Sequence, residues 1–121
     1  MDLFDGRKGF GGVKANNELQ APKKGLVYIL NLQNLGEPGS HWTLLYNGWY
    51  FDSYGVGPTK DIARFTKSYN KHQYQGVNKE SCGFYTAYVA DHILNGLNPV
   101  GDLIPGKVAH NERILKKYFI E

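Results

Sequence analysis

The sequence predicts an α+β fold in which a small mixed, mostly antiparallel sheet packs against a central helix that carries the chain's one cysteine. The 121 residues, 41% of them apolar, fit a single globular domain over residues 1–121. Fifteen glycines and nine tyrosines indicate short strands and tight turns rather than a helical bundle. An Asn-Gly pair between two apolar runs indicates a β-hairpin at the centre of the sheet.

In the first half of the chain, loop-forming residues give way to strand-forming residues. Glycine and proline interrupt residues 1–25, which therefore predict loops, with a short helix near residues 17–20. Side chains that favour strands then fill three runs that are separated by turn residues. We expect these strands at residues 25–32, 41–46 and 49–54, with turns at residues 36–39 and at Asn47-Gly48.

Helical patterns predominate in the second half. A Pro-Thr pair favours a helix start, and an Asn-Gly pair later in the chain is typical of a helix C-terminus. The expected elements are a helix over residues 58–68, a short strand over 72–75, a helix from Ser81 or Cys82 to Asn95-Gly96, and a helix over 110–118. The inward side chains expected on the cysteine helix are Phe84, Tyr85, Tyr88, Val89 and Ile93.

Composition and charge exclude several classes of protein. Cys82 is the one cysteine, so neither an intrachain disulfide nor a cysteine-based zinc finger can form. The formal charge of +3 is weaker than the charge of a dedicated nucleic-acid reader. No apolar run approaches the length of a membrane span, and the first residues lack the features of a signal peptide. We expect a soluble monomer from a reducing compartment, with no cofactor, metal or membrane contact.

The predicted hairpin carries the first piece of chemistry. A two-residue turn at Asn47-Gly48 sets the register and puts Thr43 opposite Asp52. His41 then lies on the same face as Asp52, one diagonal step away, where backbones are about 7–8 Å apart and long side chains meet. A carboxylate in that position would fix the tautomer of the imidazole and stabilise its protonated form.

The second piece of chemistry is Cys82 at the expected first turn of a helix. Unpaired backbone N–H groups and the helix dipole stabilise a thiolate there, and a nearby His41 would lower the pKa of the thiol further. Gly83 leaves the backbone open to an approaching substrate. An isolated cysteine is more often a small buried apolar residue than a nucleophile. The prediction that Cys82 is a nucleophile therefore depends on its combination with His41 and Asp52 of the hairpin.

Three motifs in fixed order resemble the adenovirus maturation protease (adenain-like cysteine peptidase) family, which is related to the SUMO- and ubiquitin-like-processing cysteine proteases. They are His-Trp at 41–42, Phe-Asp-Ser-Tyr-Gly at 51–55, and a Gln seven residues before a Cys-Gly pair, within residues 75–84. The resemblance covers most of residues 4–94. It implies an adenain-like, papain-like core, and the short chain points to a virophage, another small DNA virus or a mobile element as its source.

The resemblance also implies a role for each matching residue. Cys82 would be the nucleophile, His41 the general base and then the acid, and Asp52 the carboxylate that orients the imidazole. Gln75 would donate its side-chain amide to the oxyanion hole beside the Cys82 backbone N–H, where such a donor is worth about 2.7–4 kcal/mol of the barrier. Trp42 would form a wall of the substrate cleft, or else a core aromatic of the hairpin.

The function implied is a cysteine endopeptidase that cleaves viral capsid or core precursor proteins near Gly-Gly-like sites during virion maturation. Such a protein would act in the virion, the host cytoplasm or a virus factory, and would not be secreted. Two departures from the family stand out: the acid is Asp rather than Glu, and no second cysteine is present to take a disulfide-linked activating peptide. Activation by a disulfide-linked peptide is therefore not expected. Stimulation by DNA is possible but unsupported, although Lys107, Arg113, Lys116 and Lys117 could form a basic face.

Three alternatives stay open. A ubiquitin- or SUMO-like deconjugating protease would use the same residues. A permuted NlpC-type thiol acyltransferase or amidase also has a His-Trp strand, but its cysteine has different neighbours and it gives Gln75 no role. A non-enzymatic basic binding module would keep Cys82 as an inert core residue, and its thiol would be unreactive.

Overall fold

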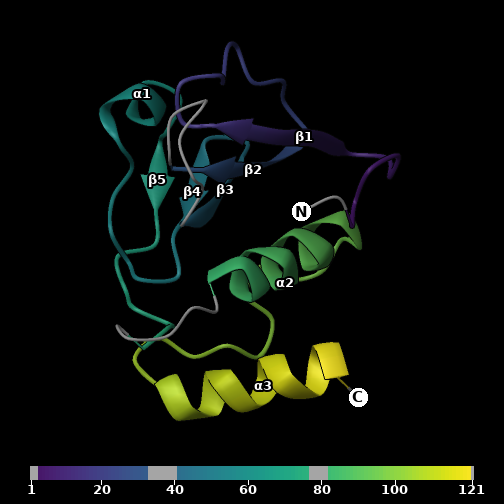
Figure 1. Cartoon of the computed structure of the whole chain (residues 1–121), viewed down its shortest axis with the longest axis vertical. Coiled ribbons are helices and arrows are strands. Elements are labelled where there is room, and N and C mark those ends of the chain that lie inside the picture. Colours follow the sequence, from purple (N-terminus) through teal and green to yellow (C-terminus); the bar gives the residue numbers. More distant parts are fainter. Residues whose placement is uncertain (1–2, 33–40, 77–81, 121) are drawn as a thin grey trace.

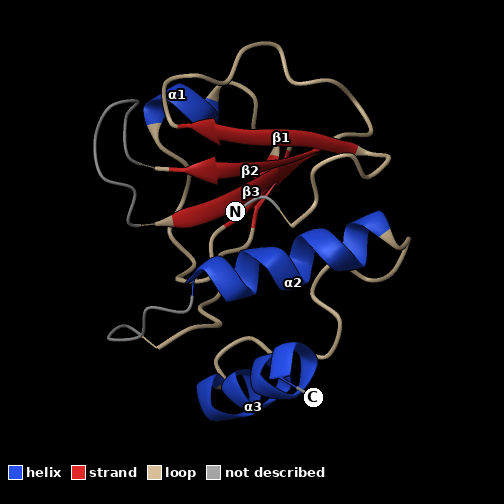
Figure 2. Ribbon diagram, turned by 45° about the vertical axis from the view of Figure 1, so that its right-hand side comes forward, coloured by secondary structure: helices blue, strands red, loops and turns tan. Residues whose placement is uncertain are grey.

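The structure is a computed structural model that describes residues 3–32, 41–76 and 82–120. Figure 1 shows a sheet, a long helix beneath it and a second long helix beyond that one. The elements in chain order are β1 (Phe10–Ala15), β2 (Val27–Asn31), β3 (Trp42–Tyr46), β4 (Trp49–Phe51), α1 (Lys60–Ala63), β5 (Ser68–Tyr69), α2 (Cys82–Leu94) and α3 (Val108–Ile120). Both views place α2 between the sheet and α3 (Figures 1 and 2).

The sheet has five strands in the order β1-β2-β3-β4-β5. The pairs β2–β3 and β3–β4 are antiparallel, whereas β1–β2 and β4–β5 are parallel. The prediction of a mixed sheet combined with helices is thus confirmed. Antiparallel pairing does not predominate, however, because each outer strand joins the central antiparallel strands in the parallel sense.

The predicted hairpin is confirmed in its register. Tyr46 pairs with Trp49, and the two turn residues Asn47 and Gly48 both have positive φ angles, of 48° and 81°. This is the conformation of a type I′ turn, for which Asn-Gly is the preferred pair because its twist matches that of the strands. The strands are shorter than predicted, since the last pair of the β3–β4 ladder is Leu44–Phe51.

The glycine-rich N-terminal segment forms β1, which the sequence prediction assigned to a loop. Glycine is needed here because the segment crosses the Tyr28 ring of β2: a Cβ at Gly11 would come within 2.5 Å of a ring carbon. The strand therefore lacks the side-chain pattern by which strands are recognised. The short helix expected near residues 17–20 is also wrong, because residues 16–18 form a turn.

Two further predictions in the middle of the chain are wrong. The helix expected over residues 58–68 is limited to α1, because the Lys67 and Ser68 amides donate to the Gly48 carbonyl and the chain continues as β5. Residues 72–75 do not form a strand, although the Tyr74 amide donates to Ser53. The turn expected at residues 36–39, and Ser81 as a helix start, lie outside the described residues.

Helix α2 confirms the predicted cysteine helix. Tyr85, Tyr88 and Val89 are buried in a core cluster with the β2, β3 and β4 side chains that face the helix. Phe84 was expected to point inward, but it is 55% exposed and packs against Phe119 of α3. The helix ends as predicted, with Gly96 at a φ of 72°.

Alternate residues of the central strands face opposite sides of the sheet. Val27, Ile29 and Leu44 face α2, whereas Tyr28, Leu30, Leu45 and Tyr50 form a second buried cluster with Ile62 of α1. This period of two gives the sheet two apolar faces. Polar residues lie instead at the strand ends next to the N-terminus of α2.

Helix α3 confirms the predicted terminal helix and is somewhat longer than expected. Asn111, which is fully buried, joins the helix to the chain before it: its side chain accepts from the Ile104 amide and donates to the carbonyls of Ile104 and Tyr74. Among the described helices none is long and apolar enough to cross a bilayer.

Candidate active site

An imidazole and a carboxylate meet at the open end of the β3–β4 hairpin, opposite its turn. His41 directly precedes β3 and Asp52 directly follows β4. The His41 Nε2 lies 3.0 Å from the Asp52 Oδ2, a contact that the predicted register puts within reach. The Asp52 side chain is only 1% exposed and the His41 side chain 20%. Little water therefore screens this pair.

The chain following β4 fixes the orientation of Asp52. Its Oδ1 accepts the Tyr54 N–H at 2.8 Å, which is the pattern of an Asx turn. Asn70 then binds the Asp52 main chain on both sides, accepting from its N–H at 2.9 Å and donating to its carbonyl at 2.6 Å. The turn closes at Gly55, where a Cβ would come within 2.9 Å of the His72 backbone. The carboxylate is thus aimed at His41 before any substrate arrives.

Helix α2 brings Cys82 to the same place. Cys82 is the first residue of α2 and is 6% exposed. One turn further on, the Thr86 hydroxyl donates to the Trp42 carbonyl at 3.0 Å and so joins the first turns of the helix to the start of β3. The Cys82 thiol in turn hydrogen-bonds the His41 side chain. Asp52 occupies the Nε2 of His41, which leaves Nδ1 as the ring nitrogen available to the thiol.

Strand pairing explains why a backbone amide also reaches the sulfur. Leu32 and His41 form a hydrogen-bonded pair, so the next pair, Asn31–Trp42, is of the non-hydrogen-bonded kind. The Trp42 amide therefore points away from β2, and the β4 ladder ends before it reaches Trp42. Backbone hydrogen bonds from Trp42 and Gly83 stabilise the ionised form of Cys82.

These contacts shift both pKa values toward an ion pair. Burial raises the pKa of the Cys82 thiol, but the hydrogen bond with His41, the two backbone hydrogen bonds and the charge of His41 lower it more, and the net shift is downward. Burial lowers the pKa of His41, but its hydrogen bonds with Asp52 and Cys82, and their negative charges, raise it to about 9. Both shifts favour a thiolate beside an imidazolium over a neutral thiol beside a neutral imidazole.

Gln75 lies next to this group on the segment that follows β5. The amides of Tyr74 and Gln75 both donate to the Ser53 carbonyl, at 2.8 and 3.0 Å. The Gln75 side chain is fully buried; its Oε1 accepts from the Ser53 hydroxyl, and its Nε2 donates to the Tyr54 hydroxyl at 3.1 Å. The Tyr54 ring packs against the His41 ring, with centroids 5.1 Å apart.

The structure thus brings His41, Asp52 and Cys82 into direct contact, and it connects Gln75 to His41 through Tyr54. The two residues expected to meet the substrate are also at this end of the molecule. Gly83 is half-buried in the first turn of α2, and the Trp42 side chain packs on the core cluster beneath the sheet. The part of Trp42 in a substrate cleft stays a prediction.

Sequence reasoning missed the residues that hold the group in place, chiefly Ser53, Tyr54, Asn70 and Thr86. Ser53 and Tyr54 directly follow Asp52, so the run of turn residues after the predicted strand was a usable local signal. Asn70 and Thr86 act across the fold, 18 and 44 residues from the groups they bind. No local sequence pattern around Asn70 or Thr86 predicts these contacts.

No protein-family model matches this chain, and no curated protein matches it. No group of three or more His, Cys, Asp or Glu side chains suited to a metal ion occurs in the part of the chain that the structure describes. The arrangement is therefore judged on its own chemistry. A thiol with a lowered pKa, hydrogen-bonded to an imidazole that a buried carboxylate orients, is the arrangement that activates a nucleophile.

Proposed function

We propose that the protein is a cysteine endopeptidase with an adenain-like core, in which Cys82 attacks a peptide carbonyl. One observation carries the proposal: His41 contacts both the Asp52 carboxylate, at 3.0 Å, and the Cys82 thiol. Each partner has a separate use. Asp52 holds the ring in position and stabilises its positive charge, and the second ring nitrogen exchanges a proton with the sulfur.

The first half of the reaction forms an acyl-enzyme. The Cys82 thiolate adds to the carbonyl carbon, and the carbonyl oxygen takes the negative charge. His41 then gives its proton to the amide nitrogen as the C–N bond breaks, so the amine product leaves neutral and a thioester remains. Thiolate attack needs no prior proton transfer, because the pKa values of both groups already favour the ion pair.

The second half restores the enzyme. Neutral His41 takes a proton from a water molecule as its oxygen attacks the thioester. The C–S bond breaks, the acid product leaves, and Cys82 regains its thiolate beside a protonated His41. The Cys82 backbone N–H and the Gln75 side-chain amide donate to the oxyanion in both halves. Gln75 suits this task because Ser53 and Tyr54 fix its side chain, and a fixed donor costs no reorganisation during the reaction.

The substrate class follows from the sequence resemblance. We propose that the substrates are precursors of viral capsid or core proteins, cleaved near Gly-Gly-like sites during virion maturation, in the virion or a virus factory. A ubiquitin- or SUMO-like deconjugating activity is the second candidate, because the acid at position 52 is Asp, as in the relatives that process SUMO. Cleavage of a Gly-Gly precursor peptide but not of a ubiquitin-like fusion would favour the first candidate.

The first test measures the rate at which iodoacetamide alkylates the protein as a function of pH. Cys82 is the one cysteine of the chain, so the signal belongs to it alone. An ordinary thiol titrates near pH 8.5, whereas a thiolate paired with an imidazolium reacts well below pH 7. We expect fast alkylation near pH 6 in the parent protein and slow alkylation in His41→Ala.

His72→Ala is the matched control, because His72 is exposed and is not among the groups that shift the pKa of Cys82. It should leave the alkylation profile unchanged. Equal profiles in the parent and His41→Ala would contradict the proposal and favour a binding module with an inert cysteine. Cys82→Ala should abolish hydrolysis of a Gly-Gly peptide in the same preparation.

A further inference from the structure

A basic groove lies at the turn end of the β3–β4 hairpin, the end opposite His41 and Asp52. It is a cavity of about 440 Å³ bordered by the turn residues Asn47 and Gly48 and by the two segments of chain that precede β2 and β5. Four cationic side chains line it, all of them exposed, and none forms an ion pair with a described residue. They are Lys23, Lys24, Arg64 and Lys67.

The groove contains no carboxylate to balance these charges. No Asp or Glu is among its lining residues. The closest comparison is a neighbouring hollow of about 400 Å³ that shares Lys23 and contains Lys14 and Glu18. There Glu18 accepts the Ala15 N–H at 2.7 Å. Four uncompensated cations in a chain whose formal charge is only +3 represent a local concentration of charge that attracts anions.

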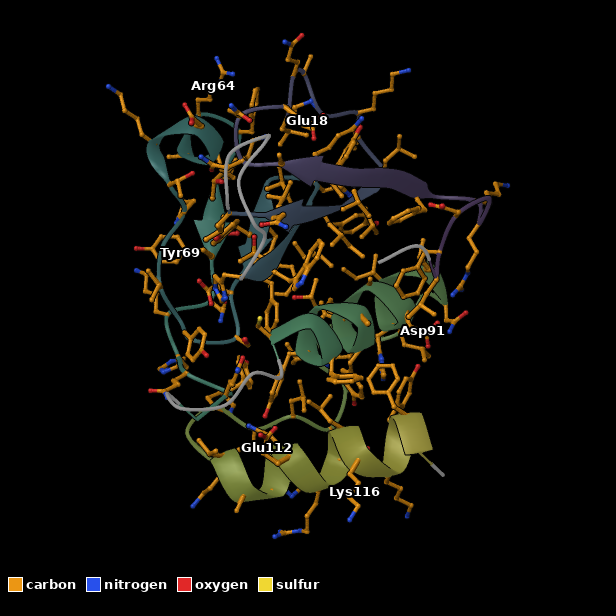
Figure 3. All side chains as sticks on the ribbon, viewed as in Figure 1. Glu18, Arg64, Tyr69, Asp91, Glu112 and Lys116 are labelled. Atoms are coloured by element: carbon orange, nitrogen blue, oxygen red, sulfur yellow. The ribbon has the colours of Figure 1, made fainter. Side chains whose placement is uncertain are left out.

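The floor of the groove is apolar. Pro22, Leu26, Leu45 and Phe65 contribute to its lining. The guanidinium of Arg64 stands over the Phe65 ring at 4.7 Å from the centroid, so this aromatic face is covered. Figure 3 shows Arg64 on the α1 side of the molecule, far from the labelled Glu112 and Lys116 of α3. The groove therefore combines a rim of cations with an apolar floor.

We propose that this groove binds an acidic segment of a protein partner, with carboxylates on the four cations and an apolar side chain on the floor. A single nucleic-acid strand fits less well. Proteins bind bases by stacking them on open aromatic faces, and here Arg64 covers Phe65 while Tyr28 is buried with its hydroxyl bound to the Lys23 amide at 2.9 Å. The apolar floor would also have no use for a phosphate backbone.

The groove and the candidate active site are separate. No residue that lines the groove belongs to the group around Cys82. The six residue-to-residue steps from His41 to Asn47 span roughly 20 Å at about 3.3 Å per step. The binding of the acidic segment therefore does not depend on the thiol chemistry, and its test needs no substrate.

The test is fluorescence anisotropy with a labelled peptide of repeated Glu-Glu-Leu units. Binding to the parent protein should be saturable at low salt and several-fold weaker at about 0.5 M salt, since exposed charges are screened over a few ångströms there. The groove variant Lys24→Gln/Arg64→Gln/Lys67→Gln should bind about tenfold or more weakly, because three charge contacts with the peptide's carboxylates are lost. A peptide of Gln-Gln-Leu units should not bind.

The matched control removes three charges elsewhere, by Lys107→Gln/Lys116→Gln/Lys117→Gln on and beside α3, where all three side chains are exposed. It should bind the peptide within twofold of the parent, and both variants should keep the parent's unfolding temperature. Absence of binding, or an equal loss in both variants, would overturn the proposal. So would an oligothymidylate of matched length that binds the groove more tightly than the acidic peptide.

Discussion

The two ion pairs found among the described residues lie near opposite ends of α2, and their charged atoms are almost equally far apart. At the N-terminal end His41 and Asp52 are 3.0 Å apart, and near the C-terminal end Arg7 and Asp91 are 2.8 Å apart. Their surroundings differ. The Asp52 side chain is 1% exposed, whereas the side chains of Arg7 and Asp91 are 36% and 23% exposed. Figure 3 shows Asp91 toward the edge of the molecule.

This difference means that equal distances do not imply equal roles. Water and salt screen the Arg7–Asp91 pair, as they do most surface pairs, so its contribution is small. The His41–Asp52 pair is shielded, and the turn after β4 orients its carboxylate. Against the effect of burial, this interaction and that with Cys82 together raise the pKa of His41 to about 9. The predictions below test whether the two ends differ as much as the geometry indicates.

The largest effect is expected for Asp52→Asn. The amide keeps the shape of the side chain but loses the negative charge, so His41 no longer favours its protonated form or a single tautomer. We expect the rate of peptide hydrolysis to fall by about 10²–10⁴-fold. Asp91→Asn removes the same charge at the other end of α2 and should leave the rate unchanged. A loss of less than tenfold in Asp52→Asn would remove the distinction between the ends.

Asp52→Asn should also change how stability depends on pH. The pKa of His41 is 6.5 when unfolded and about 9 when folded, so its protonation stabilises the fold fully below pH 6.5 and this contribution is lost as the pH rises through 9. The variant should therefore lose about 2 kcal/mol near pH 6 and clearly less near pH 10. Urea unfolding of the parent and the variant at both pH values measures this. Equal losses would show that the pair does not carry the shift.

Gln75→Ala should have the next largest effect. Loss of one fixed oxyanion donor lowers the rate constant of the chemical step by about 10²–10³-fold. The alkylation of Cys82 should stay fast at pH 6, because thiolate formation depends on His41 and not on an oxyanion. Gln73→Ala is the control, since the Gln73 side-chain amide donates to the Gln75 carbonyl and not to the Gln75 side chain. Slow alkylation in Gln75→Ala would assign Gln75 a structural part only.

The N-terminal end of α2 could be predicted from sequence to the extent that local signals determine it. The Asn47-Gly48 turn sets the register of the hairpin, and that register puts His41 within reach of Asp52. The supporting residue Asn70 could not be predicted, because its contact with Asp52 depends on the pairing of β5 with β4, which no local pattern indicates. Strand β1 was missed for a related reason: its glycines serve the close approach to Tyr28, a contact that no local pattern records.

Helix α3 extends the comparison because it contacts both ends of α2. Near its start, fully buried Asn111 donates to the Tyr74 carbonyl, which also accepts from Tyr85 of α2. Near its end, exposed Tyr118 hydrogen-bonds Asp91. Asn111→Ala leaves buried partners unsatisfied and should cost about 2–3 kcal/mol in urea unfolding, whereas Tyr118→Phe should stay within about 0.5 kcal/mol of the parent. Similar costs would mean that burial does not separate the two ends.

The smallest effect is expected for the Arg7–Asp91 pair, and its size is the strictest test of the comparison. Arg7 also donates to the Asn95 side chain at 3.1 Å, so single substitutions would mix two contacts. A double-mutant cycle of Arg7→Ala and Asp91→Ala isolates the pair. We expect a coupling energy below about 1 kcal/mol at low salt, falling further at about 0.5 M salt. A coupling above about 2 kcal/mol that resists salt would mean that a part-exposed pair equals the shielded one. The raised pKa of His41 would then owe more to the short distance between the charges than to their shielding from water.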